Sequence, residues 1–539
     1  MYGHYFAWKR IYFTQRAAAG GIGMEVSGVS LKTQILRGTV ILAAAGIITR
    51  ILGLYNRVFL ANTIGAGQMG IYQLIFPVFM VCNAVCCSGI ETALSRLTAA
   101  YGGQGRHGNI RRLVRIGVCT SMALACILAA GVYFLAGPVS IYILKEPGCK
   151  ECLKVLAFVI PFSTAHSCVL GYFYGTKQTL VPGISQLIEQ ICRVSAIYIL
   201  SVSLFYGSET GAVLAVWGMV AGDGISCIYT LISYKIHVKR LQARLEKKQA
   251  NRENETASGH FLFRQLMGDA LPLTINRLSL TVLQSIESIL IPSMLKLYYT
   301  ASGEAMEIYG VVTGMAMPFI TFPSTLTNAL ASMLLPTVAE AAAKNDYGLV
   351  KRAVSKSIHY CLLIGIFSMS IFVLYGNSLG MVFFKDEMAG QFLTSFALLC
   401  PFIYMSAALA SVLNGLGKTR LTLLHNVLSV GVRIFCVVIL VPKMGITGYF
   451  WGMLLASLFL CGLHTFRIFK LCGLFFSVMK SLVLPAICVS AAGYVSLAVY
   501  RYILSAASLP QMAVLLIPCG CMAVVYMMGL TVTKSLEWK

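Results

Sequence analysis

The stretch GTVILAAAGIITRILGLYNRVFLAN, which runs from Gly38 to Asn62, decides how the rest of the chain is interpreted. It is apolar enough to cross a bilayer as one helix, for which about 20 residues suffice. It nevertheless contains Arg50 and Arg57, although an arginine at the bilayer centre costs roughly 2.5–3.5 kcal/mol on insertion scales. Because seven residues make nearly two helical turns, both arginines lie on one face. We therefore expect this face to point toward partner helices or a wet cavity.

The composition of the whole chain is typical of a membrane protein with many helices. Of its 539 residues, 58% are hydrophobic and 11% are charged, and the mean hydropathy is +0.79. We predict an all-α polytopic membrane protein with about 14 transmembrane helices. The predicted segments cover residues 38–62, 70–95, 113–135, 153–174, 180–205, 211–234, 263–291, 309–337, 353–375, 391–414, 420–441, 446–469, 477–499 and 511–531.

The basic residues are distributed very unevenly between the two sets of connecting loops. The net charge is +23, and about 30 of the 42 Lys and Arg residues fall on one side of the predicted membrane while 6 fall on the other. Because cytoplasmic loops are enriched in Lys and Arg, this imbalance places both termini in the cytoplasm and the protein in the cytoplasmic membrane. Topology thus accounts for the net charge, and we expect no nucleic-acid partner.

The two halves of the chain resemble each other at a spacing of about 240 residues. Residues 175–200 align without gaps with residues 415–440, and Arg193 then falls on Arg433. Helices 1–6 are therefore expected to repeat as helices 7–12. Since six is an even number, the repeat is parallel, and such folds place a site between their halves.

The repeat and the loops together predict five parts of the chain. They are a cytoplasmic N-terminal segment, an N-lobe of helices 1–6, a basic cytoplasmic linker, a C-lobe of helices 7–12, and two further helices with a tail. These parts cover residues 1–37, 38–234, 235–262, 263–472 and 473–539. Met24 is a candidate for the true start, because the residues before it are unlike those that follow.

A first group of intramembrane charges is predicted to bind substrate. TRILGL at 49–54 resembles NRLSLT at 276–281, so Arg50 and Arg277 occupy matching positions in the two halves. We expect them to converge with Arg57 on a central cavity, where guanidinium groups suit a phosphate or pyrophosphate. The predicted substrate-binding residues are Arg50, Arg57, Arg277, Glu287 and Glu91. The alternative is that these arginines form structural pairs with Glu91 or Glu287.

A second group of intramembrane charges is predicted to be structural. Glu189 and Arg193 are four residues apart on one predicted helix, which favours an ion pair that Asp223 shares. For Arg433, a carbonyl contact and a hydrogen bond between helices both remain open.

Motifs for catalysis, nucleotide binding or metal binding are weak. GLGKT ends like a phosphate-binding loop, but Val412 stands where the first glycine of that loop belongs. The histidines of the apolar segments are isolated in the sequence: His166, His425 and His464. Cys149 and Cys152 form one CxxC pair, for which a disulfide and free thiols both remain open. We predict no catalytic residue, no metal ion and no cofactor, and a protein that is not an enzyme.

Several motifs resemble a known family. Residues 36–97 (LRGTVILAAAGIITRILGLYNRVFLANTIGAGQMGIYQLIFPVFMVCNAVCCSGIETALSRL) and the later motifs QSIESILIP, FPSTLTNALASMLLPTVAEA and LNGLGKTR resemble the stage V sporulation protein B family. That family belongs to the multidrug/oligosaccharidyl-lipid/polysaccharide exporter superfamily and is related to MurJ-type lipid II flippases. The resemblance spans roughly residues 36–535. It implies two six-helix lobes in a V shape.

The resemblance also implies a function. It predicts a flippase that moves a polyprenyl-pyrophosphate-linked glycan across the cytoplasmic membrane by alternating access, for cell wall or spore cortex synthesis. Through the TRILG motif it assigns Arg50 to the site, whereas residues 72–85 and 309–322 lack the further arginines of the MurJ pattern. The implied partners are a lipid-linked glycan and membrane lipids, with cell-wall synthesis enzymes as candidates.

Two other functions remain as alternatives. One is a cation-coupled multidrug antiporter of the same fold, and the other is a non-transporting membrane scaffold for wall synthesis. The segment 38–62 contains two arginines and no acidic residue, and this favours an anionic substrate over a cationic drug.

Overall fold

The computed structural model describes residues 31–203, 211–247, 257–301, 303–473, 477–506 and 510–535, and these residues are almost entirely helical. The predicted all-α fold is therefore confirmed. The candidate start at Met24 lies outside the described residues.

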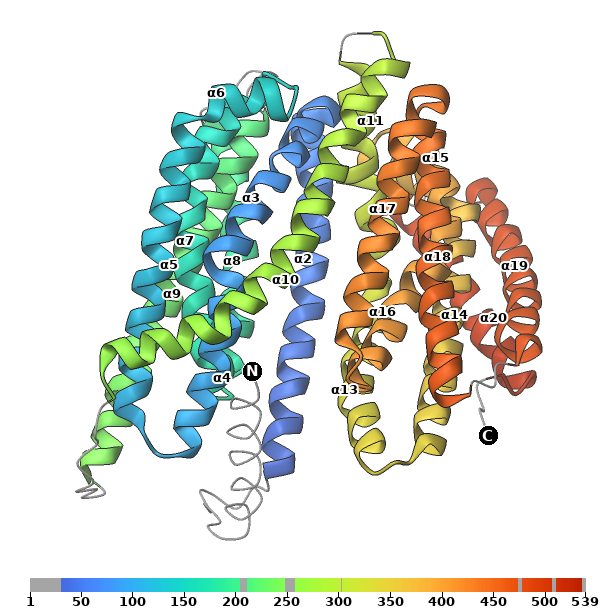
Figure 1. Cartoon of the computed structure of the whole chain (residues 1–539). Coiled ribbons are helices and arrows are strands. Elements are labelled where there is room, and N and C mark those ends of the chain that lie inside the picture. Colours follow the sequence, from blue (N-terminus) through green and yellow to red (C-terminus); the bar gives the residue numbers. More distant parts are fainter. Residues whose placement is uncertain are drawn as a thin grey trace.

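The first half of the chain forms a bundle of long helices (Figure 1). They are α2 (Leu31–Leu74), α3 (Phe76–Asn83), α4 (Gly89–Gly103), α5 (His107–Phe134), α7 (Cys149–Gly175), α8 (Leu180–Ser203) and α9 (Gly211–Lys247). The short elements η1 (Ala84–Ser88), α6 (Ala136–Pro138) and η2 (Val139–Ile143) connect them. Helix α2 is broken at Gly65, where φ is 76° and ψ is 171°. Glycine adopts such a positive φ at little cost, so the break separates the first two predicted segments.

The second half forms another bundle, followed by a helical hairpin. Its helices are α10 (Gly259–Tyr298), α11 (Glu304–Gly310), α12 (Met317–Thr321), α13 (Ser324–Ala343), α14 (Tyr347–Leu379), α15 (Glu387–Phe396), α16 (Cys400–Gly415), α17 (Thr419–Met444) and α18 (Ile446–Cys472). The short elements η4 (Val311–Ala316), η5 (Gly380–Phe384) and η6 (Ala397–Leu399) interrupt them. After η7 (Met479–Val483), the hairpin of α19 (Leu484–Ala506) and α20 (Gln511–Val532) packs against α14 outside the bundle (Figure 1).

Among the described residues, 11 helices are long and apolar enough to cross a membrane, or 12 if the pair bent by 57° at residues 322–323 counts as one span. The predicted count of fourteen is therefore not confirmed. The first two predicted segments lie in one helical run, Gly46–Gly103, and α8, which carries Glu189 and Arg193, is not among these spans. Both ends of the linker predicted at 235–262 are helical, because α9 continues to Lys247 and α10 begins at Gly259.

Two long helices connect the bundles. Helix α10 crosses between them and packs against α3, α4 and α5 of the first bundle and against α17 of the second (Figure 1). Helix α2 packs against α8 and α9 on one side and against α11 and η4 on the other. Residues on α2 and α10 are therefore placed where the two halves meet.

The two halves are in tight contact at the end where α6, α11 and α15 lie, which we call the α11 end (top of Figure 1). A Cβ atom on Gly310 would overlap the carbonyl oxygen of Ala66, so α11 and α2 touch backbone to backbone. Nearby, Asn62 Nδ2 donates a 2.8 Å hydrogen bond to the carbonyl oxygen of Phe383. These contacts close the α11 end of the interface.

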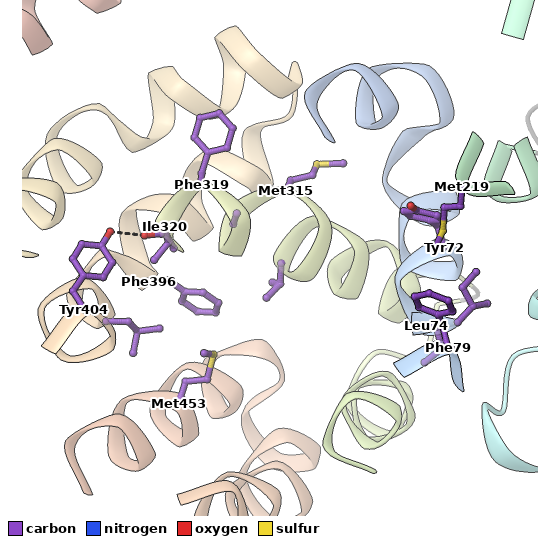
Figure 2. Packing of buried hydrophobic residues seen from close by; sticks show 14 of the residues in the cluster. Tyr72, Leu74, Phe79, Met219, Met315, Phe319, Ile320, Phe396, Tyr404 and Met453 are labelled. Carbon is purple, nitrogen blue, oxygen red and sulfur yellow. Dashed lines mark hydrogen bonds between the residues drawn. The ribbon is translucent and has the colours of Figure 1, made fainter. Parts of the chain in front are cut away.

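Buried apolar side chains of both halves form one hydrophobic core (Figure 2). The figure labels Tyr72, Leu74, Phe79 and Met219 from the first half, and Met315, Phe319, Ile320, Phe396, Tyr404 and Met453 from the second. The break between α12 and α13 interrupts the helical hydrogen bonds there. Tyr404 Oη compensates by donating a 2.5 Å hydrogen bond to the carbonyl oxygen of Ile320. This bond fixes the segment that forms one wall of the candidate site.

Candidate functional site

A cavity of about 500 Å³ lies between the two halves at the middle of α2. Arg50 and Arg57 line it together, as their helical spacing predicts. Gln190 of α8 contributes from the first half, and Thr313 and Thr321 contribute from the η4–α12 segment of the second. We call this space the Arg50 cavity.

Arg50 connects the two halves across this cavity. Its Nη1 atom donates a 3.0 Å hydrogen bond to Thr325 Oγ1 on α13. Thr325 Oγ1 in turn donates to the carbonyl oxygen of Phe322 at 2.7 Å. A guanidinium group has five N–H donors. A single bond to Thr325 therefore leaves Arg50 with donors for an anionic ligand.

Arg57 is more buried than Arg50, which is exposed. The Nη1 atom of Arg57 is buried and has no hydrogen-bond partner among the described residues. A buried donor without a partner costs about 1–3 kcal/mol, and more when the group is charged. Arg57 also lies within Coulombic range of Arg193 and of the Tyr72 hydroxyl. An anion in the cavity would therefore relieve an unfavourable arrangement at Arg57.

Three charged residues of the first half, which lie near Arg57, form a compact cluster: Glu189, Arg193 and Asp223. Arg193 Nη2 lies 2.5 Å from Glu189 Oε1 and 3.5 Å from Asp223 Oδ2. One arginine is thus bonded to two carboxylates, and the second carboxylate offsets the positive charge of nearby Arg57. The structure therefore brings together Glu189, Arg193 and Asp223, the three residues for which the sequence suggests an ion-pair cluster.

Glu287 does not lie with the predicted substrate-binding arginines. It is 5% exposed, and its Oε2 atom lies 2.8 Å from Arg433 Nη2. Glu287 is not among the residues that line the Arg50 cavity or the cavity at Arg277. This corrects the expectation for Glu287, because α17 lies along α10 and brings Arg433 to it.

Arg277 lines a separate cavity of about 740 Å³. Its wall includes Arg420 from the start of α17 and polar side chains such as Asn83 and Gln284. The expectation that Arg50 and Arg277 share one cavity is therefore not met. Their matching positions in the repeat do not bring them together, since α10 crosses the first bundle while α2 stands between the bundles (Figure 1).

Glu91 and Arg420 complete the charges around Arg277. Glu91 is half-buried and lies within Coulombic range of Arg277. Arg96, further along α4, lies 3.5 Å from Asp269 and not beside Glu91. Arg420 was missed as a site residue, because in the sequence it stands out only as the last residue of the LNGLGKTR motif. Arg420 and Arg277 are far apart in the sequence, so no sequence pattern indicates that they line the same cavity.

A long apolar groove of about 620 Å³ adjoins the Arg50 cavity. Leu54 and Phe322 line both spaces, so the two lie side by side with these side chains between them. The rest of the groove is formed mainly by apolar residues of α12, α13, α14, η5 and α20, including Phe367 and Tyr526, whose rings stack. The sequence alone did not reveal this groove, because its walls come from helices far apart along the chain.

Comparison with known proteins identifies relatives over most of the chain. Residues 35–342 match the family model described as "Polysaccharide biosynthesis protein". Stage V sporulation protein B of Bacillus subtilis (strain 168) is 27% identical over 481 residues, which cover 88% of this chain and 91% of that protein. The lipid II flippase MurJ of the same organism is 20% identical over 446 residues, covering 78% and 79%, respectively.

Solved structures share the fold. A structure of lipid II flippase MurJ in an inward closed conformation superposes with a TM-score of 0.68 at 14% identity, and the match covers 92% of this chain and 98% of that one. An inward-facing multidrug resistance MATE family transporter superposes with a TM-score of 0.59 at 14% identity, covering 80% and 98%. These likenesses, with the many apolar helices, show a multi-pass membrane protein. Because the family model matches more than half of its length, this chain belongs to the polysaccharide biosynthesis protein family.

Proposed function

We propose that this protein is a flippase that moves a polyprenyl-pyrophosphate-linked glycan across the cytoplasmic membrane by alternating access. One observation carries the proposal: a cavity with two arginines adjoins, at Leu54 and Phe322, a groove lined almost entirely by apolar side chains. This pairing fits an amphiphile with an anionic head and a long hydrocarbon tail. The glycan would belong to cell wall or spore cortex synthesis, as the relatives suggest.

Arg50 and Arg57 are the proposed binding groups for the pyrophosphate. Guanidinium groups bind phosphate oxygens through paired, charge-assisted hydrogen bonds. Arg50 has donors beyond its bond to Thr325, and Arg57 Nη1 has no partner among the described residues. The anionic head would therefore satisfy donors that the protein leaves unsatisfied.

The apolar groove is the proposed path for the polyprenyl chain. Burial of hydrocarbon against apolar side chains needs no hydrogen bonds. The groove can therefore hold a tail of repeating apolar units without specific contacts to any one unit. The head group and tail would then lie on either side of Leu54 and Phe322.

Movement of the head group requires the two halves to change their relative positions. The α11 end is closed by the contact of Gly310 with Ala66 and by the Asn62–Phe383 hydrogen bond. If the termini are cytoplasmic, as the basic loops predict, the α11 end is the outer end and the site is loaded from the cytoplasm. An inside-negative membrane potential would favour outward movement of the anionic head, by about 2.3 kcal/mol per charge and 100 mV.

A cation-coupled multidrug antiporter is the second candidate function, because the MATE transporter has the same fold. The two arginines of the Arg50 cavity disfavour a cationic drug on electrostatic grounds. A scaffold without transport activity is the third candidate. Neither alternative predicts that a lipid pyrophosphate crosses the membrane.

Reconstitution separates these candidates. The purified protein is placed in liposomes with a fluorescent polyprenyl-pyrophosphate-linked sugar, and transbilayer movement is scored by quenching from the outer leaflet. The proposal expects protein-dependent movement that is absent for a neutral polyprenol-linked analogue. Equal movement of both lipids, or none of either, would contradict it.

A further inference from the structure

We propose that the first bundle carries a second anion site, distinct from the Arg50 cavity, which binds a phosphate group at the end opposite α11. The site is a pocket of about 420 Å³ where the ends of α4 and α7, the start of α5 and the last turns of α9 meet. We call it the Lys177 pocket. It shares no lining residue with the Arg50 cavity, so this inference does not depend on the proposed function.

The charges around the pocket have one sign. Arg111 and Lys177 line it, together with His107. No Asp or Glu is among the described residues that line it. A pocket with cations and no neutralising carboxylate concentrates a positive potential, which attracts an anion.

Two polar atoms in the pocket wall have no hydrogen-bond partner among the described residues. Thr98 is 1% exposed, and its Oγ1 atom is unpartnered. The Nδ1 atom of His107 is likewise buried and unpartnered. Buried polar atoms are nearly always bonded, so each exception calls for an explanation. A phosphate group, with several acceptor oxygens, would accept hydrogen bonds from both.

His237 shows by contrast how a polar side chain of the pocket is satisfied. Its Nδ1 atom lies 2.9 Å from Tyr172 Oη, and its Nε2 atom lies 2.6 Å from Gln178 Nε2. Both ring nitrogens are therefore engaged within the protein. His237 is thus held in place, and Thr98, His107, Arg111 and Lys177 are among the lining groups available to a ligand.

The backbone at Lys177 provides a comparison within the molecule. Lys177 has a φ of 58°, in the left-handed region that favours glycine. The gapless repeat places Lys177 on Gly417, which has a φ of 73° in the equivalent turn before α17. The second half thus uses glycine in this turn, whereas the first half keeps a lysine despite the strain. Positive φ at a lysine also occurs at Lys145, Lys385 and Lys534, so the backbone agrees with a role for the Lys177 side chain without carrying the inference.

Helix α5 adds a favourable dipole to the pocket. It begins at His107, and the preceding residue Arg106 provides no side-chain cap for its first amides. The N-terminus of a helix carries a partial positive charge and suits phosphate oxygens. Orphaned donors, cations and a helix start therefore coincide in one pocket.

The chemistry indicates a phosphate ester or inorganic phosphate, and two sources can supply it. One is the head group of an anionic phospholipid, since the basic loops predict that this end lies at the cytoplasmic membrane surface. The other is a soluble phosphate compound. Both would bind through the same four side chains.

Ligand-dependent thermal stabilisation of the full-length protein in a neutral detergent tests the site. One arm titrates phosphatidylglycerol against phosphatidylcholine, and the other titrates inorganic phosphate against chloride at matched ionic strength. Stabilisation that saturates gives an apparent Kd. We expect Lys177→Gly and Arg111→Gln each to raise this Kd about tenfold, the loss typical of one charge-assisted hydrogen bond. The matched control is Arg115→Gln, which removes an exposed charge from the same helix outside the pocket and should change the Kd less than about twofold.

Two variants test whether weaker ligand binding is caused by misfolding. Lys177→Gly relieves the left-handed strain and Thr98→Val removes an orphaned hydroxyl, so neither should lower the melting temperature without ligand. Both should reduce the stabilisation by ligand. Stabilisation by phosphatidylglycerol alone assigns a lipid head group, and stabilisation by inorganic phosphate assigns a soluble ligand. The site is refuted if neither titration saturates, or if Arg115→Gln weakens binding as much as Arg111→Gln.

Discussion

Arg50 Nη1 on α2 donates a 3.0 Å hydrogen bond to Thr325 Oγ1 on α13, and this contact joins the two halves of the molecule inside the cavity where we place the substrate head group. An anion that takes the Nη1 donors of Arg50 would compete with Thr325 for them. Under the proposed function, binding of the substrate would thereby be coupled to separation of the halves at this guanidinium group.

The ion pair of Glu287 and Arg433 should be structural. Glu287→Gln removes one partner of a buried pair and leaves Arg433 without its carboxylate, which we expect to cost about 3 kcal/mol of stability. Glu287→Gln combined with Arg433→Gln should recover part of this loss. The measurement is the melting temperature of the purified variants in one detergent.

A matched control is available for that experiment. Lys344 and Glu340 form an exposed ion pair on α13 and the turn after it, with exposed fractions of 69% and 70%. Because solvent screens such pairs, Lys344→Gln should leave the melting temperature unchanged. Equal, additive losses from Glu287→Gln and Arg433→Gln would show that the two residues are not coupled.

The cluster around Arg193 should tolerate loss of one acid better than loss of both. Glu189→Gln leaves Asp223 as a partner 3.5 Å away, and Asp223→Asn leaves Glu189. The variant that lacks both acids strands Arg193 beside Arg57, so its membrane abundance should fall by more than the product of the two single effects. Adding Arg193→Gln to it should restore part of the abundance. No recovery would mean that the acids have a role other than neutralising Arg193.

These two ion pairs show what the sequence can and cannot predict. The spacing of Glu189 and Arg193 lies within one helix, so helical geometry alone suggested their contact. Glu287 and Arg433 lie on different helices, and the sequence gives no angle at which α10 and α17 cross. The repeat alignment of Arg433 with Arg193 therefore did not identify Glu287 as the partner of Arg433.

In the candidate site, too, the sequence predicted what lies within one helix but not what lies between helices. Arg50 and Arg57 could be placed on one face of a helix from their spacing, and the structure has them in one cavity. The convergence of Arg50 with Arg277 was inferred from equivalent positions, and it fails because equivalent residues need equivalent helix tilts. The apolar groove depends on side chains from helices distant in sequence, which hydropathy patterns do not assemble.

The close approach at the α11 end should control outward opening. Gly310→Leu introduces a side chain where even a Cβ atom would overlap the Ala66 carbonyl oxygen, so it should hold this end apart. A cysteine at Thr313 in the Arg50 cavity should then react faster with a membrane-impermeant thiol reagent added outside cells, in a variant without other cysteines. Gly137→Ala at the same end is the control, because its Cβ would meet nothing within 4 Å. An unchanged labelling rate in Gly310→Leu would show that this contact does not close the outer path.

The orientation of the molecule can be tested at two exposed residues. Lys239 is exposed near the far end of α9, and Tyr142 is 79% exposed next to α6 at the α11 end. With both termini in the cytoplasm, Tyr142→Cys should be labelled in intact cells and Lys239→Cys only after permeabilisation. The reverse pattern would invert the topology and the proposed direction of loading.

Arg50 provides the most direct test of the central claim. Arg50→Lys keeps the charge but loses the bidentate geometry, so it should reduce flipping of a fluorescent polyprenyl-pyrophosphate-linked sugar partly, whereas Arg50→Ala should reduce it at least about tenfold. Thr325→Val is the matched control, since it removes the partner of Arg50 and keeps the guanidinium group. The decisive measurement is the flipping rate per folded molecule of Arg50→Ala in liposomes. The account predicts a normally folded protein with a strongly reduced rate, and it is contradicted if this variant flips at the wild-type rate or fails to fold.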